Sequence, residues 1–415
     1  MSSLSLNLAF PSCLPSVSTK DFGTYCKIAT LKLASYLTDP ICNVRDYAYT
    51  FYKAEDLFQG DAKIVIWAKK FFLILGIALY APLAPFTAPL GVALRSLVRL
   101  VQDKPFIYLE ADPQKGKQLP LSLECTAYQQ NVCLMKGGYN ITDGQVSSSS
   151  ERIDPIIKDI LEEDQDVVCL SEVPDIVDAD YLSKKIRHKY PFIIPIAGVR
   201  GIGPSSMLYI ASKYEIVKES IEFAPFPKEC MSGRASKSEK GVLSFDLKSQ
   251  GQDKAFMRVF STHLQHSEES AFPQEEEVAA REAQMQFIMT KINAVKDKAV
   301  LFLGDLNLSD EPLDVEKDKK VVRQNNEFEN ASWSNRFIRN VTNLLEKTWG
   351  GDSWCTRFMD KRASKPLTLD YALLYKGSAH SITTKVQPST YDGSKFVRSA
   401  RSDHKALLTR VIMRF

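Results

Sequence analysis

Several polar residues that could bind a cation or move a proton stand at the ends of apolar, strand-like runs. Glu172 follows the run DVVCLS, where a carboxylate is costly unless it is paired or binds a cation. Asp305 and Asn307 follow the run AVLFLG, and the two-residue period of a strand predicts that both side chains point to one face. A carboxylate and an amide oxygen that converge in this way suit a hard cation. The sequence therefore predicts a Mg²⁺ site, for which Mn²⁺ is a second candidate.

Other polar residues occupy similar positions along the chain. Asn131 begins the run NVCLM, and His263 ends the run FMRVFSTHL. Asp370 enters the run LDYALLY, while Asp403 and His404 precede the last apolar run. Taken singly, the acids could be turn formers or structural ion-pair partners, the histidines could belong to the core, and the asparagine could cap a turn. Their recurrence at successive strand ends favours one shared catalytic site.

The elements that must position these residues are short strands with few helices between them. An apolar stripe over 153–161 predicts a helix, and a second helix is expected over roughly 275–295. The charged, Asn-rich stretch 310–335 is interpreted as a solvent loop. A mixed sheet or two stacked sheets with outer helices fits this α/β pattern better than a simple βαβ repeat. The strand-like runs lie at 131–135, 166–173, 206–212, 241–247, 256–264, 299–306, 369–375 and 404–415.

Composition limits the class of protein. The 415 residues are 44% hydrophobic and 25% charged, with a net charge of +3, which excludes a mainly disordered or coiled-coil chain. The near-neutral balance disfavours a dedicated nucleic-acid binder. The eight cysteines show no CxxC spacing, so no zinc or redox motif is predicted. Cys133 and Cys169 lie in apolar runs and are expected to be buried, reduced thiols, which favours a reducing compartment.

An uncharged segment near the N-terminus predicts association with a membrane. Residues 71–94 form 24 positions without charge, which is long enough to cross a bilayer core. Three prolines within it leave a hairpin insertion as an alternative to a full crossing, and a buried helix of a globular domain is a third possibility. The lysines before it and arginines after it could contact anionic phospholipid or be ordinary flanking charge. We expect a membrane-associated region over 1–125 and a catalytic domain over 126–415.

The ordered polar motifs resemble those of the endonuclease/exonuclease/phosphatase superfamily of Mg²⁺-dependent phosphoesterases. The resemblance covers about 126–415 and rests on the motifs NV, LSEV, STHL, GDLN, LDY and SDH. The usual second motif has Gln where this chain has Ser171, beside the acidic residue and not at it. The resemblance implies a four-layer αββα sandwich, in agreement with the number of strand-like runs.

Within this superfamily, the chain is most similar to the membrane-anchored neutral sphingomyelinases. The similarity rests on TAYQQNVCLM (126–135), on the apolar segment ahead of KPFIYLE, and on the Lys-Gly pair in EKGVLSFDL (239–247). Two features differ: the large insertion of the animal enzymes after the first motif is absent, and MSGRASKSE (231–239) contains no Asp like the one that pairs with their lysine. The resemblance implies hydrolysis of sphingomyelin to ceramide and phosphocholine at a membrane. Alternatives are an inositol polyphosphate phosphatase, an endonuclease, or a membrane-tethered scaffold without activity.

The resemblance also implies metal and phosphate roles for five residues. Glu172 would bind the metal directly, with Asp403 supporting the metal site. Asn131 would position the metal or the phosphate, and would be a metal ligand or a substrate contact. Asn307, together with the acid two positions before it, would orient the nucleophile and the scissile phosphate.

The remaining roles concern proton transfer and the substrate. His404 would be the general base, oriented by Asp370, because an imidazole with a pKa near 6.5 can accept a proton at neutral pH. His263 would stabilise the phosphate or the leaving oxygen, and Lys240 of the Lys-Gly pair would also act at the site. The expected partner is a membrane lipid substrate, and no nucleic-acid partner is expected.

Overall fold

The fold is taken from a computed structural model of the whole chain. The structure describes residues 21–52, 54–57, 61–110, 116–118, 124–135, 149–267, 274–295, 298–310, 314–317, 320–323, 326–342, 347–349, 367–376, 380–387 and 402–413. Every residue singled out above as a site candidate lies within these ranges.

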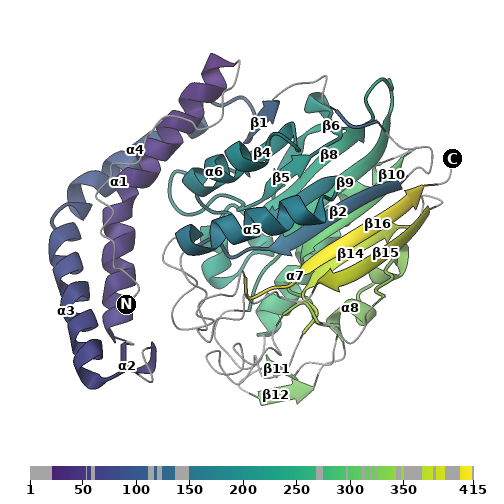
Figure 1. Cartoon of the computed structure of the whole chain (residues 1–415). Coiled ribbons are helices and arrows are strands. Elements are labelled where there is room, and N and C mark those ends of the chain that lie inside the picture. The colour runs from purple at the N-terminus through teal and green to yellow at the C-terminus, as the bar shows by residue number, and fades with distance from the viewer. Residues whose placement is uncertain are drawn as a thin grey trace.

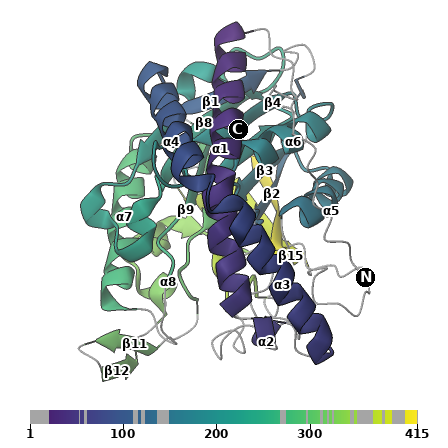
Figure 2. The ribbon, with the colours of Figure 1, turned by 90° about the vertical axis from the view of Figure 1, so that its left-hand side faces the viewer.

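A group of N-terminal helices stands beside the rest of the chain (Figure 1). Its members are α1 (Phe22–Tyr52), α2 (Ala54–Leu57), α3 (Lys63–Tyr80) and α4 (Ala84–Val101). Helices α3 and α4 run back along α1 in turn, with a bend between them (Figures 1 and 2). The contact of α1 with α4 is close, since a Cβ at Gly91 would lie 2.7 Å from the carbonyl oxygen of Ala34. Only glycine fits at that position.

The apolar segment 71–94 is divided between two helices. Helix α3 ends at Tyr80, a turn follows, and α4 begins at Ala84 with Pro85 in its first turn, where proline is tolerated. None of the residues of α3, all of which the structure describes, is buried. By length and composition, Ala84–Val101 could cross a membrane, with a mean hydropathy of 1.2 and 17% of the window buried. The segment is therefore neither one straight helix nor a buried core helix.

Two seven-stranded mixed sheets form the centre of the molecule (Figure 1). The first has the order β1-β4-β5-β3-β2-β16-β15, and the second has the order β13-β14-β10-β9-β8-β6, with β7 paired to β8. The strands of the first sheet are β1 (Phe106–Glu110), β2 (Glu124–Asn131), β3 (Val167–Ser171), β4 (Phe192–Ala197), β5 (Tyr209–Ser212), β15 (His380–Gln387) and β16 (Ala406–Met413). Those of the second sheet are β6 (Glu215–Ile216), β7 (Glu222–Pro225), β8 (Gly241–Lys248), β9 (Ala255–His263), β10 (Ala299–Asp305), β13 (Phe337–Ile338) and β14 (Asp370–Tyr375).

Helices cover the outer faces of both sheets. Helices α5 (Ser149–Glu163) and α6 (Ile176–Ile186) pack on the first sheet, and α7 (Glu275–Asn293) packs on the second. One apolar core fills the space between the sheets, and two more lie between each sheet and its helices. The predicted four-layer αββα sandwich is therefore confirmed. Shorter elements are β11 (Asp314–Lys317), β12 (Lys320–Arg323), α8 (Glu327–Asn330) and the 3-10 helices Lys218–Ser220, Lys228–Cys230, Gly233–Lys237 and Ser334–Arg336.

The apolar patterns explain why these elements form. The stripe predicted for the first helix is realised in α5, where Ile153, Ile156 and Ile160 are buried against the sheet. Strands β3 and β10 are apolar at nearly every position because both of their faces are covered. Cys133 and Cys169 are buried and free, as expected.

Three expectations were wrong in detail. Asn131 ends strand β2 and does not begin a strand, so the apolar residues after it lie in a turn. The stretch 310–335 is not simply a loop, because it contains a two-stranded sheet and α8. Strand β1 pairs with β4, so residues 106–110 belong to the sandwich, although the predicted N-terminal region extended to residue 125.

The N-terminal helices are fixed to the sandwich by buried polar contacts. The Lys32 ammonium of α1 lies 2.8 Å from the Asp180 carboxylate of α6, and their side chains are 4% and 1% exposed. Three residues further along α1, the Ser35 hydroxyl donates to Asp175 at 2.8 Å. Asp175 is the N-cap of α6 and accepts the Val177 N–H at 2.9 Å. Helix α1 therefore contacts the helix that begins just after Glu172.

Removal of one partner of this buried ion pair should weaken the fold. Asp180→Asn removes the carboxylate charge that lies 2.8 Å from the buried Lys32 ammonium, which should lower the free energy of unfolding by about 3–5 kcal/mol. Urea denaturation measures this change. Glu162→Gln, which breaks the exposed Lys158–Glu162 pair, is the control and should change the value by less than about 0.5 kcal/mol. Equal stability of the Asp180→Asn variant and the unsubstituted protein would show that α1 is not held by this pair.

Candidate active site

The strand pairing brings the predicted residues to one edge of the sandwich. Strands β2 and β3 are parallel, so Asn131 and Glu172 leave the same end of the first sheet. Strands β9 and β10 are also parallel, and His263 lies opposite Asp305. The antiparallel strand β14 begins where β10 ends, so Asp370 lies opposite Asp305. Residues that are far apart in sequence therefore meet because the register requires it.

Asn131 joins the two buried carboxylates of the site. Its Nδ2 donates to Glu172 Oε1 and to Asp305 Oδ2, each at 2.9 Å. Its Oδ1 accepts the N–H of Cys133 at 3.1 Å, which fixes the direction of the amide. Asn131 therefore turns its nitrogen to the carboxylates in this structure, and its predicted role as a metal ligand stays a prediction.

Strained backbone conformations surround this centre. Glu172, Cys133 and Asn307 have φ values of 61°, 47° and 50°, in the left-handed region that residues other than glycine rarely adopt. The buried Arg152 of α5 holds the turn after β2, donating to the carbonyl oxygens of Val132, at 2.9 Å, and Cys133. Such conformations persist where the surrounding contacts impose them, and they are concentrated at functional sites.

The conformation of Asn307 differs from the expected one. Strand β10 ends at Asp305, so the two residues do not share the face of one strand. The N–H of Asn307 donates to Asp305 Oδ1 at 2.9 Å, and its Nδ2 donates to the Leu264 carbonyl at 3.3 Å. Lys240 Nζ donates to the same carbonyl at 2.7 Å. Lys240 precedes β8 directly and is buried, so its side chain is fixed beside the strand end that carries His263.

A histidine and an aspartate form a buried pair at the other side of Asp305. His404 Nδ1 lies 2.7 Å from Asp370 Oδ2, and His404 Nε2 lies 3.8 Å from Asp305 Oδ2. The second oxygen of Asp370 accepts from Gln129 Nε2 at 3.0 Å. The carboxylate of Asp403 also lies near this ring, with its Oδ2 3.9 Å from His404 Nε2. One imidazole nitrogen is thus held by Asp370, and the other faces two carboxylates.

Two glutamines of this site were not predicted. Gln129 contacts Asp370, and Gln130 Nε2 donates to the backbone oxygen of His404 at 3.0 Å. Both belong to β2 and are buried. Their position directly before Asn131 in the run AYQQN was a usable signal, since buried glutamines in a central strand need hydrogen-bond partners.

The pKa values of two carboxyl groups and one histidine of the site are raised, and that of a lysine is lowered. Burial, and then the charge of Asp403, raise the pKa of Glu172, and burial raises the pKa of Asp305 to about 7. Burial lowers the pKa of Lys240 to about 8. Burial opposes protonation of His404, but the carboxylates of Asp370, Asp403 and Asp305 raise its pKa well above the ordinary value. The site therefore concentrates negative charge that a cation would stabilise.

His263 lies against the two carboxylates from the second sheet. Its Nε2 is 3.7 Å from Glu172 Oε1 and 3.6 Å from Asp305 Oδ2. Burial, and then the charge of Lys240, hold the pKa of His263 well below its ordinary value, so the ring is neutral at pH 7. Its Nδ1 is buried and has no hydrogen-bond partner among the described residues. The ring is thus available as a neutral donor or acceptor beside the carboxylates.

The donor set fits a hard divalent cation. Ligand atoms of Glu172, His263 and Asp305 lie within 4.8 Å of one another, and the same holds for Asp305, Asp370 and His404. Each group combines carboxylate oxygens with one imidazole nitrogen, and carboxylate oxygens are the ligands that Mg²⁺ and Mn²⁺ prefer. The buried carboxylates with raised pKa values are the observation that a cation would explain.

Comparison with known proteins supports the fold assignment. No protein-family model and no curated protein matches the sequence. The structure of sphingomyelinase C from Streptomyces griseocarneus matches with a TM-score of 0.53 and 19% identity, over 69% of this chain and 99% of that chain. A mutant beta toxin from Staphylococcus aureus with bound magnesium ions matches with a TM-score of 0.52 and 21% identity, over 70% of this chain and 100% of that chain.

This chain shares the fold of these proteins. The predicted resemblance is therefore confirmed as a likeness of fold to a sphingomyelinase C and to a beta toxin. At this level of identity the match concerns the fold, and the chemistry depends on the residues of the site described above.

The raised pKa of Asp305 predicts a pH-dependent stability without metal. Between the unfolded value near 3.9 and the folded value of about 7, the folded state binds more protons, so the free energy of unfolding falls as pH rises through this range. Asparagine does not titrate, so the Asp305→Asn variant does not lose this stability as pH rises. In EDTA, the melting temperature of the variant minus that of the unsubstituted protein should therefore increase from pH 5 to pH 8. Differential scanning fluorimetry measures both proteins, with Glu162→Gln as the control. A constant difference across this range would refute the assigned pKa.

Proposed function

We propose that this chain is a divalent-cation-dependent phosphodiesterase that hydrolyses sphingomyelin to ceramide and phosphocholine at a membrane. One observation carries the reaction class: the buried carboxylates of Glu172 and Asp305 share Asn131 and lie next to the His404–Asp370 pair. Hydrolysis of a phosphodiester requires stabilisation of charge on the phosphoryl oxygens and a group that takes a proton from water. This arrangement offers both.

Glu172 and Asp305 are the residues that would hold the cation. Asn131 fixes the position of both carboxylates, and Asp403 adds negative charge from the side of His404. When bound, Mg²⁺ or Mn²⁺ supplies Lewis-acid stabilisation of the negative charge on the phosphoryl group. The rigid, strained turns at Glu172 and at Cys133 keep the oxygens in place before any ligand arrives.

His404 is the proposed general base. Asp370 holds its Nδ1, so Nε2 is the nitrogen that accepts a proton from water. Without a cation, the surrounding carboxylates favour the protonated imidazole, which cannot act as a base. Neutralisation of Asp305 by a cation would remove one of these carboxylate charges and lower the pKa of His404. Cation binding and readiness of the base are therefore linked.

Three further residues are proposed to contact the phosphate. The neutral His263 ring lies between the two carboxylates and can donate one hydrogen bond. Asn307 and Lys240 converge on the Leu264 carbonyl at the edge of the site. The pKa of Lys240 is about 8, so most of the amine is an ammonium at pH 7 and can stabilise phosphoryl charge.

Two observations favour a lipid substrate. Helices α3 and α4 expose large apolar side chains, among them Trp67, Phe71, Phe72 and Phe86, which are 67%, 62%, 51% and 80% exposed. An exposed apolar surface of this kind is typical of a membrane contact. One structure with the same fold is a sphingomyelinase C, which supports sphingomyelin within the class of lipid phosphodiesters. An inositol polyphosphate phosphatase and an endonuclease remain the alternatives to be tested.

The reaction and substrate are tested together. Purified full-length protein with Mg²⁺ should release ceramide from sphingomyelin-containing liposomes, and EDTA should abolish the release. His404→Ala should lower kcat by at least about 10²-fold, since it removes the general base. The panel includes liposomes with phosphatidylcholine or a phosphoinositide, an inositol polyphosphate, and abasic DNA. Cleavage of one of these without ceramide release would replace the lipid proposal, and full turnover after chelation would overturn the metal proposal.

Membrane association is tested on the exposed face of α3. Ile74 and Leu75 are each 52% exposed, and a lysine at either position costs about 2.5–3.5 kcal/mol where it enters a bilayer core. The Ile74→Lys/Leu75→Lys variant should float with vesicles of phosphatidylcholine, phosphatidylserine and sphingomyelin much less than the unsubstituted protein. Glu276→Lys on α7 changes the net charge equally and should float normally. Equal flotation of all three proteins would rule out this face as the membrane contact.

A further inference from the structure

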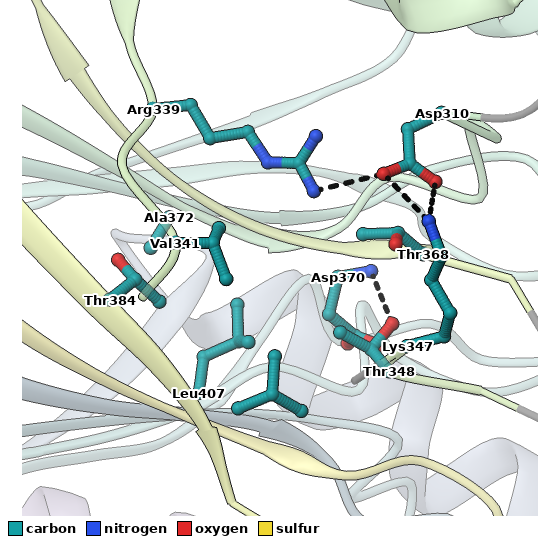
Figure 3. Close-up of a pocket in the computed structure, with 11 residues that line it drawn as sticks. Asp310, Arg339, Val341, Lys347, Thr348, Thr368, Asp370, Ala372, Thr384 and Leu407 are labelled. Atoms are coloured by element: carbon teal, nitrogen blue, oxygen red, sulfur yellow. Dashed lines mark hydrogen bonds and ion pairs between the residues drawn. The ribbon is translucent and has the colours of Figure 1, made fainter. Parts of the chain in front are cut away.

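A buried threonine contacts both chain segments that carry the His404–Asp370 pair. Thr348 is 0% exposed and belongs to a short described segment, 347–349. Its hydroxyl oxygen accepts the backbone N–H groups of Leu369, at 2.9 Å, and Asp370, at 3.1 Å. Its carbonyl oxygen accepts the N–H of Lys405 at 2.7 Å. Figure 3 shows the contact with Asp370 at the wall of a cavity of about 170 Å³.

These contacts link the two halves of the pair through one residue. The side chain of Thr348 fixes the backbone where Asp370 enters β14, and its main chain fixes the residue after His404. The next residue, Trp349, forms single β-bridges with Leu367 and with His404. The distance from His404 Nδ1 to Asp370 Oδ2, 2.7 Å, depends on the spacing of these two segments.

The segment that carries Thr348 is itself held in place. Lys347 Nζ lies 3.3 Å from Asp310 Oδ1, and Arg339 lies 3.2 Å from Asp310 Oδ2. The Arg339 guanidinium also stacks over the ring of Tyr371, 4.8 Å from its centroid. Asp310 follows β10 by five residues, so the same ion pairs connect Thr348 to the loop after Asp305 (Figure 3).

We propose that Thr348 is a positioning residue that sets the geometry of the His404–Asp370 pair. The inference rests on the proposed role of His404 as general base, and the hydrogen bonds of Thr348 go to the backbone on either side of the pair and not to the imidazole. A hydroxyl at this position accepts from the buried N–H of Asp370 and the partly buried N–H of Leu369 at once, which a hydrocarbon cannot do. Its loss would let the two segments shift, and small displacements of reacting groups lower catalytic rates strongly.

The test compares variants that differ in one hydroxyl. Thr348→Val keeps the shape and removes the acceptor, whereas Thr348→Ser keeps the acceptor. With Mg²⁺ and the chromogenic diester bis(p-nitrophenyl) phosphate, Thr348→Val should lower kcat at least about tenfold, with KM and the Mg²⁺ dependence nearly unchanged. Thr348→Ser should restore most of the rate. Thr384→Val, at the opposite wall of the same cavity, is the control and should behave as the unsubstituted protein.

A second readout does not depend on substrate. Proton NMR should show a strongly deshielded signal for the hydrogen bond between His404 Nδ1 and Asp370, and Thr348→Val should shift or broaden it while Thr348→Ser retains it. If the valine variant does not fold, Thr348→Ala takes its place beside the serine variant. Folded variants with the unchanged signal and kcat, or a serine variant as impaired as the valine variant, would overturn the proposal. Failure of the unsubstituted protein to cleave any diester would refute the proposed function instead, and the NMR comparison would still decide the role of Thr348.

Discussion

The structure depends on a concentration of buried negative charge where the two sheets end together. Glu172 and Asp305 are held 2.9 Å from the same amide nitrogen of Asn131. Asp370 and Asp403 flank them on the side of His404, at 2.7 Å and 3.9 Å from its ring nitrogens. Ionised carboxylates in such a place are costly without a counter-charge. The raised pKa values of Glu172 and Asp305 express this cost, and a divalent cation would remove it.

The sandwich supplies the rigidity that keeps these charges together. The parallel pairs β2–β3 and β9–β10 place their ends at one edge, and the apolar core between the sheets fixes the distance across it. The buried ion pair between Lys32 and Asp180 attaches the N-terminal helices to α6, which begins four residues after Glu172. A protein anchored through these helices would therefore hold its active site at a fixed orientation to the membrane, which a flexible linker would not do.

The sequence identified the candidate residues because a polar group stands at the beginning or the end of each of these apolar runs. The helix stripe at 153–161 and the strand-like runs left a mixed sheet or two stacked sheets open, and the resemblance to the superfamily implied the four layers. The sequence could not give the direction of the Asn131 amide, because its partners lie 41 and 174 residues away in the chain. Thr348 was missed for a related reason: its two N–H partners lie 21 and 22 residues further on, beyond any local pattern. The break at Tyr80 follows from the prolines, but the packing of α1 along both resulting helices is a tertiary contact.

Direct measurement of Mg²⁺ binding tests the central claim, that the buried carboxylates form a cation site. Isothermal titration calorimetry at pH 7.5 would compare the metal-stripped protein with Glu172→Gln, and with Glu162→Gln on the exposed face of α5 as the control. The account predicts saturable binding to the unsubstituted protein and to the control, and binding at least about tenfold weaker in Glu172→Gln. Undetectable binding to the unsubstituted protein, or equal affinity in the Glu172→Gln variant, would contradict it.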